Sequence, residues 1–480
     1  MTEHKENIYI NKMVKSIIFV AVLLLPQFAF AKDYSLQDCI DIALKNDPNI
    51  VVSESMKSVQ KARVGQQKSD YFPKLTAGTG FYHQNNNMTM NNNYGNMGGM
   101  NSNNYYQLNL GVNQLIWNFG KTIAKINMQK YNLESAGYDY ENQVLNTTYR
   151  VKFAYFGVLA ALANQDIAER TVSINQLNYD RTKALFDEGL KSKIDVVNAE
   201  VYLTDAKIQL LDAQNKYLIS MITLNNAMYN TDKTHYGVKN TENFNFTRLK
   251  PVKNEINVNT VKKQNSNELE YTAVLTSGIE KQDILQDYKF LPMLVTEEDA
   301  IKKAYENRPD LKSLLMVKKA SEESLKSIQR SYMPSLSANV GYSWRKNQDI
   351  TNSGFNTSAS LDFSAVNLMN VKCSIDEAKS YLKIADENIN LSKKNIFFEV
   401  QTNYTNMVQL EKRIPLKAQK VKQTLENFEL ADGRYSVGLG NFIELQNAQL
   451  NYNNAQLDLV AAVFNYNVAR ETLLKSMGVK

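Results

Sequence analysis

The feature that most constrains the fold of this chain is an internal duplication. Asn46-Asp47-Pro48 recurs as Asn307-Arg308-Pro309, and Tyr71-Phe72-Pro73-Lys74-Leu75 recurs as Tyr332-Met333-Pro334-Ser335-Leu336. Both matches lie 261 positions apart (48 to 309 and 73 to 334). Internal repeats decide the architecture before any local pattern does. The chain therefore consists of two copies of one structural unit.

The first copy holds extra residues. Gly189-Leu190 matches Gly438-Leu439 at a separation of 249, which is 12 fewer than the separation of the earlier landmarks. We assign the difference to the Asn-, Met- and Gly-rich tract from Asn85 to Asn104 and expect a loop there, because loops tolerate insertions. The predicted domains are a first repeat over 32–229, a polar linker over 230–293 and a second repeat over 294–478.

Residues 1–31 have the pattern of a secretory signal peptide. Lys12 and Lys15 precede the apolar run Ile17–Leu25, and Ala29-Phe30-Ala31 offers a cleavage site of small residues. The run is short for a membrane-spanning helix, which needs about 20 apolar residues. We expect an exported protein that is cleaved after Ala31, and the sequence leaves open whether translation starts at Met1 or Met13.

Period-two alternation follows each Tyr-x-Pro landmark and predicts two β-hairpins. The predicted strands cover about 74–84 and 105–116 in the first copy and about 335–345 and 355–366 in the second. One face is apolar; in the second copy it comprises Leu336, Ala338, Val340, Tyr342, Trp344, Phe355, Thr357, Ala359, Leu361 and Phe363. Strands of about ten residues with one apolar and one polar face are typical of transmembrane β-strands. A half-buried hairpin of a soluble domain is the alternative.

Two very long helices are predicted, over Lys121–Phe186 and Asn370–Tyr435, because almost no helix breaker interrupts these stretches. At 1.5 Å per residue each helix reaches about 100 Å, which does not suit a compact globular domain. Pro415 is the exception, and we expect a bend there. A Gly-containing turn then reverses the chain, and a second helix returns in each copy.

The returning helices carry a heptad seam in which large and small residues alternate. It comprises Val196, Ala199, Leu203, Ala206, Leu210, Ala213, Tyr217, Ser220 and Leu224, and, 249 positions on, Leu445, Ala448, Tyr452, Ala455, Leu459, Ala462, Tyr466, Ala469 and Leu473. A second seam beside it comprises Val197, Val201, Thr204, Ile208 and Leu211, and Leu450, Leu457 and Phe464. Helices with two seams have two neighbours and can close into a cylinder, although a four-helix bundle with a wide core is the alternative.

The composition argues against an enzyme and against a nucleic-acid-binding protein. The formal net charge of +6 is small for 480 residues, and no basic patch lies outside the leader. Histidine occurs only at positions 4, 83 and 235, and no triad, phosphate loop or zinc-ligand spacing is present. We therefore expect no enzyme activity and no cofactor. Of the two cysteines, Cys39 lies on an apolar helix stripe and is predicted to be a core residue.

One group of side chains has ligands for a soft metal. His83 and the methionines of the Asn-rich tract, Met88, Met90, Met97 and Met100, lie close together in the sequence. Thioethers bind Cu(I) or Ag(I). Methionine is common in this chain, so an exterior loop without metal is the preferred interpretation.

The duplicated plan resembles the TolC-like outer-membrane efflux family over about Ser35 to Gly478. The resemblance is carried by the Asn-x-Pro and Tyr-x-Pro-x-Leu landmarks, the Tyr-Ser-Val-Gly-Leu turn at Tyr435–Leu439 and the Leu-Ile-Trp-Asn-Phe-Gly stretch at Leu115–Gly120. It implies a homotrimer in the outer membrane, with four strands per subunit in one 12-stranded β-barrel and the helices in one long periplasmic α-helical barrel. Such a channel would connect, through a periplasmic adaptor, to an inner-membrane transporter of the resistance-nodulation-division or ABC type.

The resemblance also implies roles for two groups of residues. The tips that dock the adaptor would be Gly189, Leu190, Val437, Gly438 and Leu439, and the periplasmic gate would comprise Asp195, Tyr435, Glu444 and Asn447. Gly440 stands where a basic partner would be expected, so we expect no Arg or Lys near these acids and a mutually repelling ring that attracts cations. The alternative is that Asp195 and Glu444 only stabilise the first turn of a helix through its dipole.

The favoured function is therefore an exit duct of a tripartite efflux or type I secretion system. The sequence does not separate drug efflux from protein secretion or metal export. The rival classes are a helical surface stalk or adhesin without transport activity and a diffusion porin, which would have many more strands and few helices.

Overall fold

The computed structural model describes residues 33–90, 97–231, 236–242, 244, 246, 257–262, 271–276, 292–347, 350–363 and 368–479. At 84–90, 97–103, 257–262, 271–276, 347 and 350 it describes the backbone alone. The expected cleavage site at Ala31 and the side chains of Met88, Met90, Met97 and Met100 lie outside the described part.

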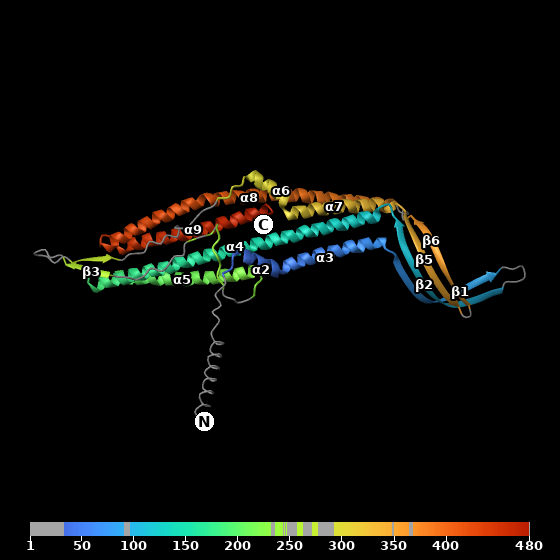
Figure 1. Ribbon diagram of the computed structural model, residues 1–480, viewed down its shortest axis with the longest axis horizontal. Helices are drawn as coiled ribbons and strands as arrows, with labels where there is room; N and C mark the ends of the chain where they lie inside the picture. The colour runs from blue at the N-terminus through green and yellow to red at the C-terminus, as the bar shows by residue number, and fades with distance from the viewer. Residues whose placement is uncertain are drawn as a thin grey trace, which may run out of the picture.

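The molecule is long and narrow, with a β-sheet at one end and helical turns at the other (Figure 1). The first repeat contains α2 (Leu36–Asn46), α3 (Pro48–Lys68), η1 (Ser69–Tyr71), β1 (Lys74–Met90), β2 (Met97–Trp117), α4 (Lys121–Asp187) and α5 (Lys193–Ala227). The second contains α6 (Glu297–Asn307), α7 (Pro309–Gln329), η2 (Arg330–Tyr332), β5 (Ser335–Asn347), β6 (Ile350–Asp362), α8 (Leu368–Ser436) and α9 (Phe442–Ser476). Between them, β3 (Asn257–Lys262) pairs with β4 (Tyr271–Thr276). Within the described part, no helix has both the length and the apolar character needed to cross a bilayer.

The Asn-x-Pro landmark separates two helices in each repeat. The carboxylate of Asp47 accepts a hydrogen bond from the backbone N–H of Asn49 at 2.8 Å and so caps α3. Pro48 and Pro309 occupy the start of α3 and α7, where a helix needs no amide hydrogen bond. Each repeat therefore begins with an arm of two short helices, α2–α3 or α6–α7, which lies beside a long helix (Figure 1).

The four long strands form one antiparallel sheet in the order β1-β2-β5-β6. Their register places the predicted apolar residues on one face: Leu75 is opposite Val112, Val112 is opposite Val340, and Val340 is opposite Thr357. The predicted alternation is therefore confirmed across both hairpins. The sheet leaves β1 and β6 as its two edges.

The first hairpin is longer than predicted. The tract from Asn85 to Asn104 was expected to form a loop, but β1 continues to Met90 and β2 begins at Met97, and these two residues pair. This expectation is wrong because strand pairing across an existing hairpin overrides the low β propensity of Asn and Gly. In the second hairpin β6 covers Ile350–Asp362 rather than 355–366.

The helical core follows the predicted seams. On α9 the seam residues Leu445, Ala455, Leu459 and Leu473 are fully buried. The corresponding seam on α5 is buried from Val196 to Ala206 and again at Leu224, and half-buried between. The helix α8 continues through Pro415. Cys39 is fully buried, as predicted, and its burial raises the pKa of the thiol to about 12.

Candidate functional site at the helical tips and the protomer edges

Both helical hairpins end in the same turn. At the end of α4, Gly189 has φ of 74°, and the N–H of Leu190 donates to the carbonyl of Leu185 at 2.8 Å. At the end of α8, Gly438 has φ of 79°, and the N–H of Leu439 donates to the carbonyl of Arg434 at 2.9 Å. This is the Schellman arrangement, in which glycine adopts the left-handed conformation that closes the last helical turn. Glycine at these two positions is thus required by the backbone.

The tips present apolar side chains to the surroundings. Leu190 is 52% exposed, Val437 64% and Leu439 77%. The turn geometry requires glycine but does not require leucine or valine beside it, so these three side chains are available for contact with another molecule. The predicted docking residues therefore lie together at the two turns.

Asp195 and Glu444 each occupy the first turn of a returning helix. The carboxylate of Asp195 accepts hydrogen bonds from the hydroxyl of Ser192 at 2.8 Å and from its N–H at 3.2 Å. The N–H of Glu444 donates to the side chain of Asn441 at 2.7 Å. Both acids are half-buried and stabilise the helix start, whether or not they also line a channel.

The expectation that no basic residue lies near these acids is wrong. The guanidinium of Arg434 lies 3.3 Å from the carboxylate of Glu444. Arg434 is in the last turn of α8, and the chain reversal at Gly438 brings it against the first turn of α9. The Arg434 and Glu444 side chains are 59% and 41% exposed, so the pair contributes little stability, but it partly neutralises the negative charge at this position.

Tyr435 is not at the surface of the protomer. It is 2% exposed, and burial raises the pKa of its hydroxyl, although a hydrogen bond with Thr182 of α4 opposes this effect. The two hydroxyls are 3.0 Å apart. The ammonium of Lys191 lies 4.9 Å from the centre of the tyrosine ring. Asn447, the fourth predicted gate residue, is exposed on α9.

A buried polar cluster beside Tyr435 was not predicted from the sequence. Arg181 of α4 is 1% exposed and pairs with Asp432 of α8 at 2.9 Å. The side chain of Asn178 donates to Gln449 of α9 at 3.2 Å. With Thr182 and Tyr435, these residues join α4 to the α8–α9 hairpin just behind the tips. We call this set the mouth latch: Asn178, Arg181, Thr182, Asp432, Tyr435 and Gln449.

Two edges of the protomer expose apolar residues at heptad spacing. On α5 the predicted second seam is exposed, with Val197 at 44%, Val201 at 52%, Ile208 at 53% and Leu211 at 66%. The opposite edge is α8, where Ile384, Leu391 and Phe398 are exposed at intervals of seven residues, Ile384 beside the groove over α7. Figure 1 shows α5 and α3 along one side of the molecule and α8 along the other. In the described part of the protomer, these apolar residues are not covered by another element.

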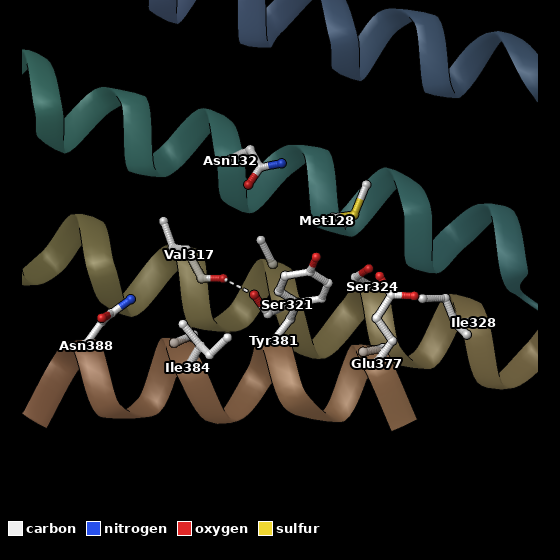
Figure 2. A pocket seen from close by; sticks show the side chains of 13 residues that line it. Met128, Asn132, Val317, Ser321, Ser324, Ile328, Glu377, Tyr381, Ile384 and Asn388 are labelled. Carbon is white, nitrogen blue, oxygen red and sulfur yellow. Dashed lines mark hydrogen bonds between the residues drawn. The ribbon is translucent and has the colours of Figure 1, made fainter. Parts of the chain in front are cut away.

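Grooves between the helices are shallow and mostly apolar. One of about 470 Å³ runs across α7, between Met128 and Asn132 of α4 and Tyr381 and Ile384 of α8 (Figure 2). Another of about 600 Å³ lies between α4, α5 and α9 and contains the second-seam residues Leu450, Leu457 and Phe464. The second seam of α9 thus lines an open groove between helices of the same protomer, where Leu450 and Leu457 remain partly exposed, whereas that of α5 lies along the outer edge.

The proposed soft-metal group cannot be placed in full. His83 is exposed, and its ring nitrogen lies 2.6 Å from the side-chain oxygen of Asn104. The four methionine side chains lie outside the described part of the chain. Among the described residues, no group of three or more His, Cys, Asp or Glu side chains has the geometry of a metal site.

The fold has relatives of known structure. The family model described as outer membrane efflux protein matches residues 39–228 and 300–479. Outer membrane protein TolC of Salmonella enteritidis is 24% identical over 131 residues, which is 26% of this chain and 27% of that protein. The outer-membrane channel OprN superposes with a TM-score of 0.69 at 14% identity over 93% of this chain and 90% of its own. The CmeC outer membrane channel of Campylobacter jejuni gives 0.69 at 16% identity over 92% and 85%.

Proposed function

This chain belongs to the outer membrane efflux protein family, and we propose that it forms the outer-membrane exit channel of a tripartite efflux system. Channels of this family form trimers. The observation that carries the proposal is the shape of the protomer: a narrow strip of sheet and helices with two open edges. A strip of this kind buries its edges by closing with further copies into a tube.

Each part of the tube would have its own role. Three four-stranded sheets would form a barrel whose apolar face contacts outer-membrane lipid and whose polar face lines water, as the register supports. The long helices would continue this channel across the periplasm. Transport would be powered by an inner-membrane transporter of the resistance-nodulation-division or ABC type, linked through a periplasmic adaptor.

The tips are the proposed docking site for the adaptor. Gly189 and Gly438 set the turns, while Leu190, Val437 and Leu439 project apolar side chains from a rigid helical frame. Exposed apolar side chains that form a patch mark protein-interaction surfaces, and Val437 and Leu439 flank Gly438 within one turn. A partner with a complementary apolar groove would bury them without disturbing the turns.

Changing Leu190 or Leu439 to Asp tests the docking site. We expect trimers to form normally, because both side chains are exposed, but adaptor cross-linking and drug resistance should fall several-fold as a charge enters an apolar contact. Leu190→Met and Leu439→Met keep the apolar character and serve as controls. Normal cross-linking and normal resistance in the Asp variants would contradict the docking assignment.

The periplasmic end is the proposed gate. Asp195, Glu444 and Asn447 would repeat three times around the constriction, and the mouth latch would hold the helices in the closed position. Arg434 reduces the negative charge contributed by Glu444, so Asp195 would contribute most of the preference for cations.

Ion selectivity in planar bilayers tests this gate. We expect low, cation-selective conductance for the unmodified channel and clearly weaker cation selectivity for Asp195→Asn. Glu444→Gln should have a smaller effect because Arg434 already compensates that charge. Asp212→Asn on α5, away from the tips, is the control. Equal selectivity in all four proteins would remove these acids from the constriction.

A further inference from the structure

The two duplicated helix junctions carry ion pairs of opposite polarity. Asp47, between α2 and α3, pairs with Arg150 of α4 at 2.9 Å. Arg308, between α6 and α7, pairs with Glu399 of α8 at 2.6 Å. Positions 47 and 308 are 261 apart and positions 150 and 399 are 249 apart, the same separations as the repeat landmarks. The acid and the base have therefore exchanged places between the copies.

In the first pair, the acid is buried and has further hydrogen bonds besides its ion pair. The Asp47 side chain is completely buried and also accepts hydrogen bonds from the hydroxyl of Thr147 at 2.5 Å and the N–H of Asn49 at 2.8 Å. Burial alone would raise the pKa of this carboxyl, but these hydrogen bonds and the charge of Arg150 together hold it below its ordinary value. Asp47 is thus a fixed negative charge at neutral pH.

In the second pair, the base has the additional contacts. The guanidinium of Arg308 bonds to Glu399 and also to Asp310 at 2.7 Å, and it reaches the carbonyl of Ser476 at 3.4 Å. Asp310 occupies the position of Asn49 in the first repeat, 261 residues earlier. The whole junction has therefore changed together, rather than one residue alone.

The second arm contacts two long helices, and among the described residues its ion pairs to a long helix are with α8. Its contacts with α4 include Lys319 over the ring of Tyr131. The hydroxyls of Ser313 in α7 and Ser135 in α4 are 2.9 Å apart, while Lys318 of α7 pairs with Asp386 of α8 at 2.7 Å. The α4 position equivalent to Glu399 is occupied by Arg150. If this arm moved to the equivalent site on α4, Arg308 would face a like charge instead of an opposite one.

The same holds for the first arm. It lies on α4, where Arg150 complements Asp47. The corresponding site on α8, of the same chain or of a neighbouring copy, carries Glu399 and would repel Asp47. Both repeats offer arms and long helices of nearly equal length, so shape alone distinguishes them poorly.

We propose that the inverted ion pairs form a pairing code, which assigns each two-helix arm to the long helix of its own repeat and excludes the matching site on the other repeat. Specificity of this kind arises when the wrong partner meets an unfavourable charge, and not only because the right partner meets a favourable one. Charged residues set partner choice in coiled coils in the same way. The proposal rests on the contacts within one protomer and is independent of docking and gating.

A variant that makes both junctions alike tests the code. In Arg308→Asp/Asp310→Asn/Glu399→Arg the second junction reproduces the first, including an acid that can cap α7, and an opposite-charge pair is kept. The code is lost, because both long helices now carry Arg and both arms carry Asp. We expect the yield of trimers to fall at least about threefold. Arg308→Lys/Glu399→Asp changes the same pair but keeps the signs, and should assemble like the unmodified protein.

Cysteine cross-linking measures directly which long helix, α8 or α4, the second arm contacts at its junction. The hydroxyl of Tyr305 lies 3.2 Å from the carbonyl of Lys393 on α8, and Val144 is the equivalent α4 position, 249 residues earlier. In a Cys373→Ser background, Tyr305→Cys is combined with either Lys393→Cys or Val144→Cys and treated with a short bismaleimide. Total cell protein is analysed, so cross-linked products of chains that fail to assemble into trimers are also detected.

The expected result is cross-linking to position 393 alone in the unmodified junction and in the sign-preserving control. In the uniform variant, cross-linking to position 144 should rise at least about fivefold. If that product does not rise, the pairing code is overturned, whether trimer yield is normal or reduced. A reduced yield without the product at position 144 would mean that the second junction contributes stability only.

Discussion

At the scale of single residues, the end of the molecule near the tips is held together by buried polar contacts rather than by apolar packing alone. Arg181, Asp432, Thr182 and Tyr435 join helices from different repeats, and the pair Arg181–Asp432 is separated by 251 positions in the sequence. The sequence could not reveal this latch, because polar residues are frequent along α4 and their partners become evident only when the repeats pack. The helix seams, by contrast, were predicted from local periodicity.

Replacing Tyr435 with Phe should loosen the latch. The change removes the hydroxyl that bonds to Thr182, while the Thr182 hydroxyl keeps its hydrogen bond to the carbonyl of Asn178 at 2.7 Å. The expected cost is therefore that of one hydrogen bond, about 0.5–1.5 kcal/mol. We expect higher single-channel conductance and unchanged trimer yield. Tyr452→Phe, at a buried tyrosine further along α9, should leave conductance unchanged. Identical conductance for both variants would show that the Tyr435 hydroxyl does not hold the mouth.

At the scale of elements, local sequence signals predicted the ends of a long helix, but they did not predict features that depend on contacts between distant residues. Gly120 and Gly189 marked the ends of the first long helix, so the predicted Lys121–Phe186 differs from the observed α4 by one residue. The length of the first hairpin was missed because it depends on pairing between β1 and β2. The Arg434–Glu444 pair was missed because only the chain reversal brings α8 and α9 together at that point.

The two faces of the sheet should differ sharply in their tolerance of charge. Val340→Arg or Leu361→Arg places a charge on the apolar face, which we expect to cost about 2–4 kcal/mol near the middle of a bilayer. Ser337→Arg and Ser360→Arg, on the polar face where these hydroxyls are 3.0 Å apart, should assemble. Heat-modifiable trimer in outer-membrane fractions measures the difference. Equal yields for both faces would contradict insertion of this sheet in lipid.

At the scale of the whole molecule, both sheet edges and both helical edges are open along the same two sides. One side comprises β1, α3 and α5, and the other comprises β6 and α8. The apolar residues on α5 and α8 recur with the spacing of a coiled-coil seam. A neighbouring copy can therefore close the sheet and the helices in one continuous contact.

Leu211→Glu should disrupt assembly. Leu211 is 66% exposed on the α5 edge, and burying a leucine contributes about 1.5–3 kcal/mol, a contribution that a symmetric trimer would repeat at each interface. We expect loss of the trimer on native gels while the monomer keeps its helical circular dichroism. Lys207→Glu, also exposed on α5, introduces the same side chain off the seam and should be tolerated. A normal trimer for Leu211→Glu would contradict the assignment of α5 to the interface.

The distance between the helix junctions and the tips makes each helical hairpin a lever. Arg150 fixes α4 to the first arm, and α4 ends at Asp187, so the free arm of the lever is about 55 Å long at 1.5 Å per residue. A tilt of about 10° at this pivot sweeps the tip through an arc of about 10 Å. Under the proposed gate, release of the mouth latch would let a rotation of this size open an aperture of molecular dimensions.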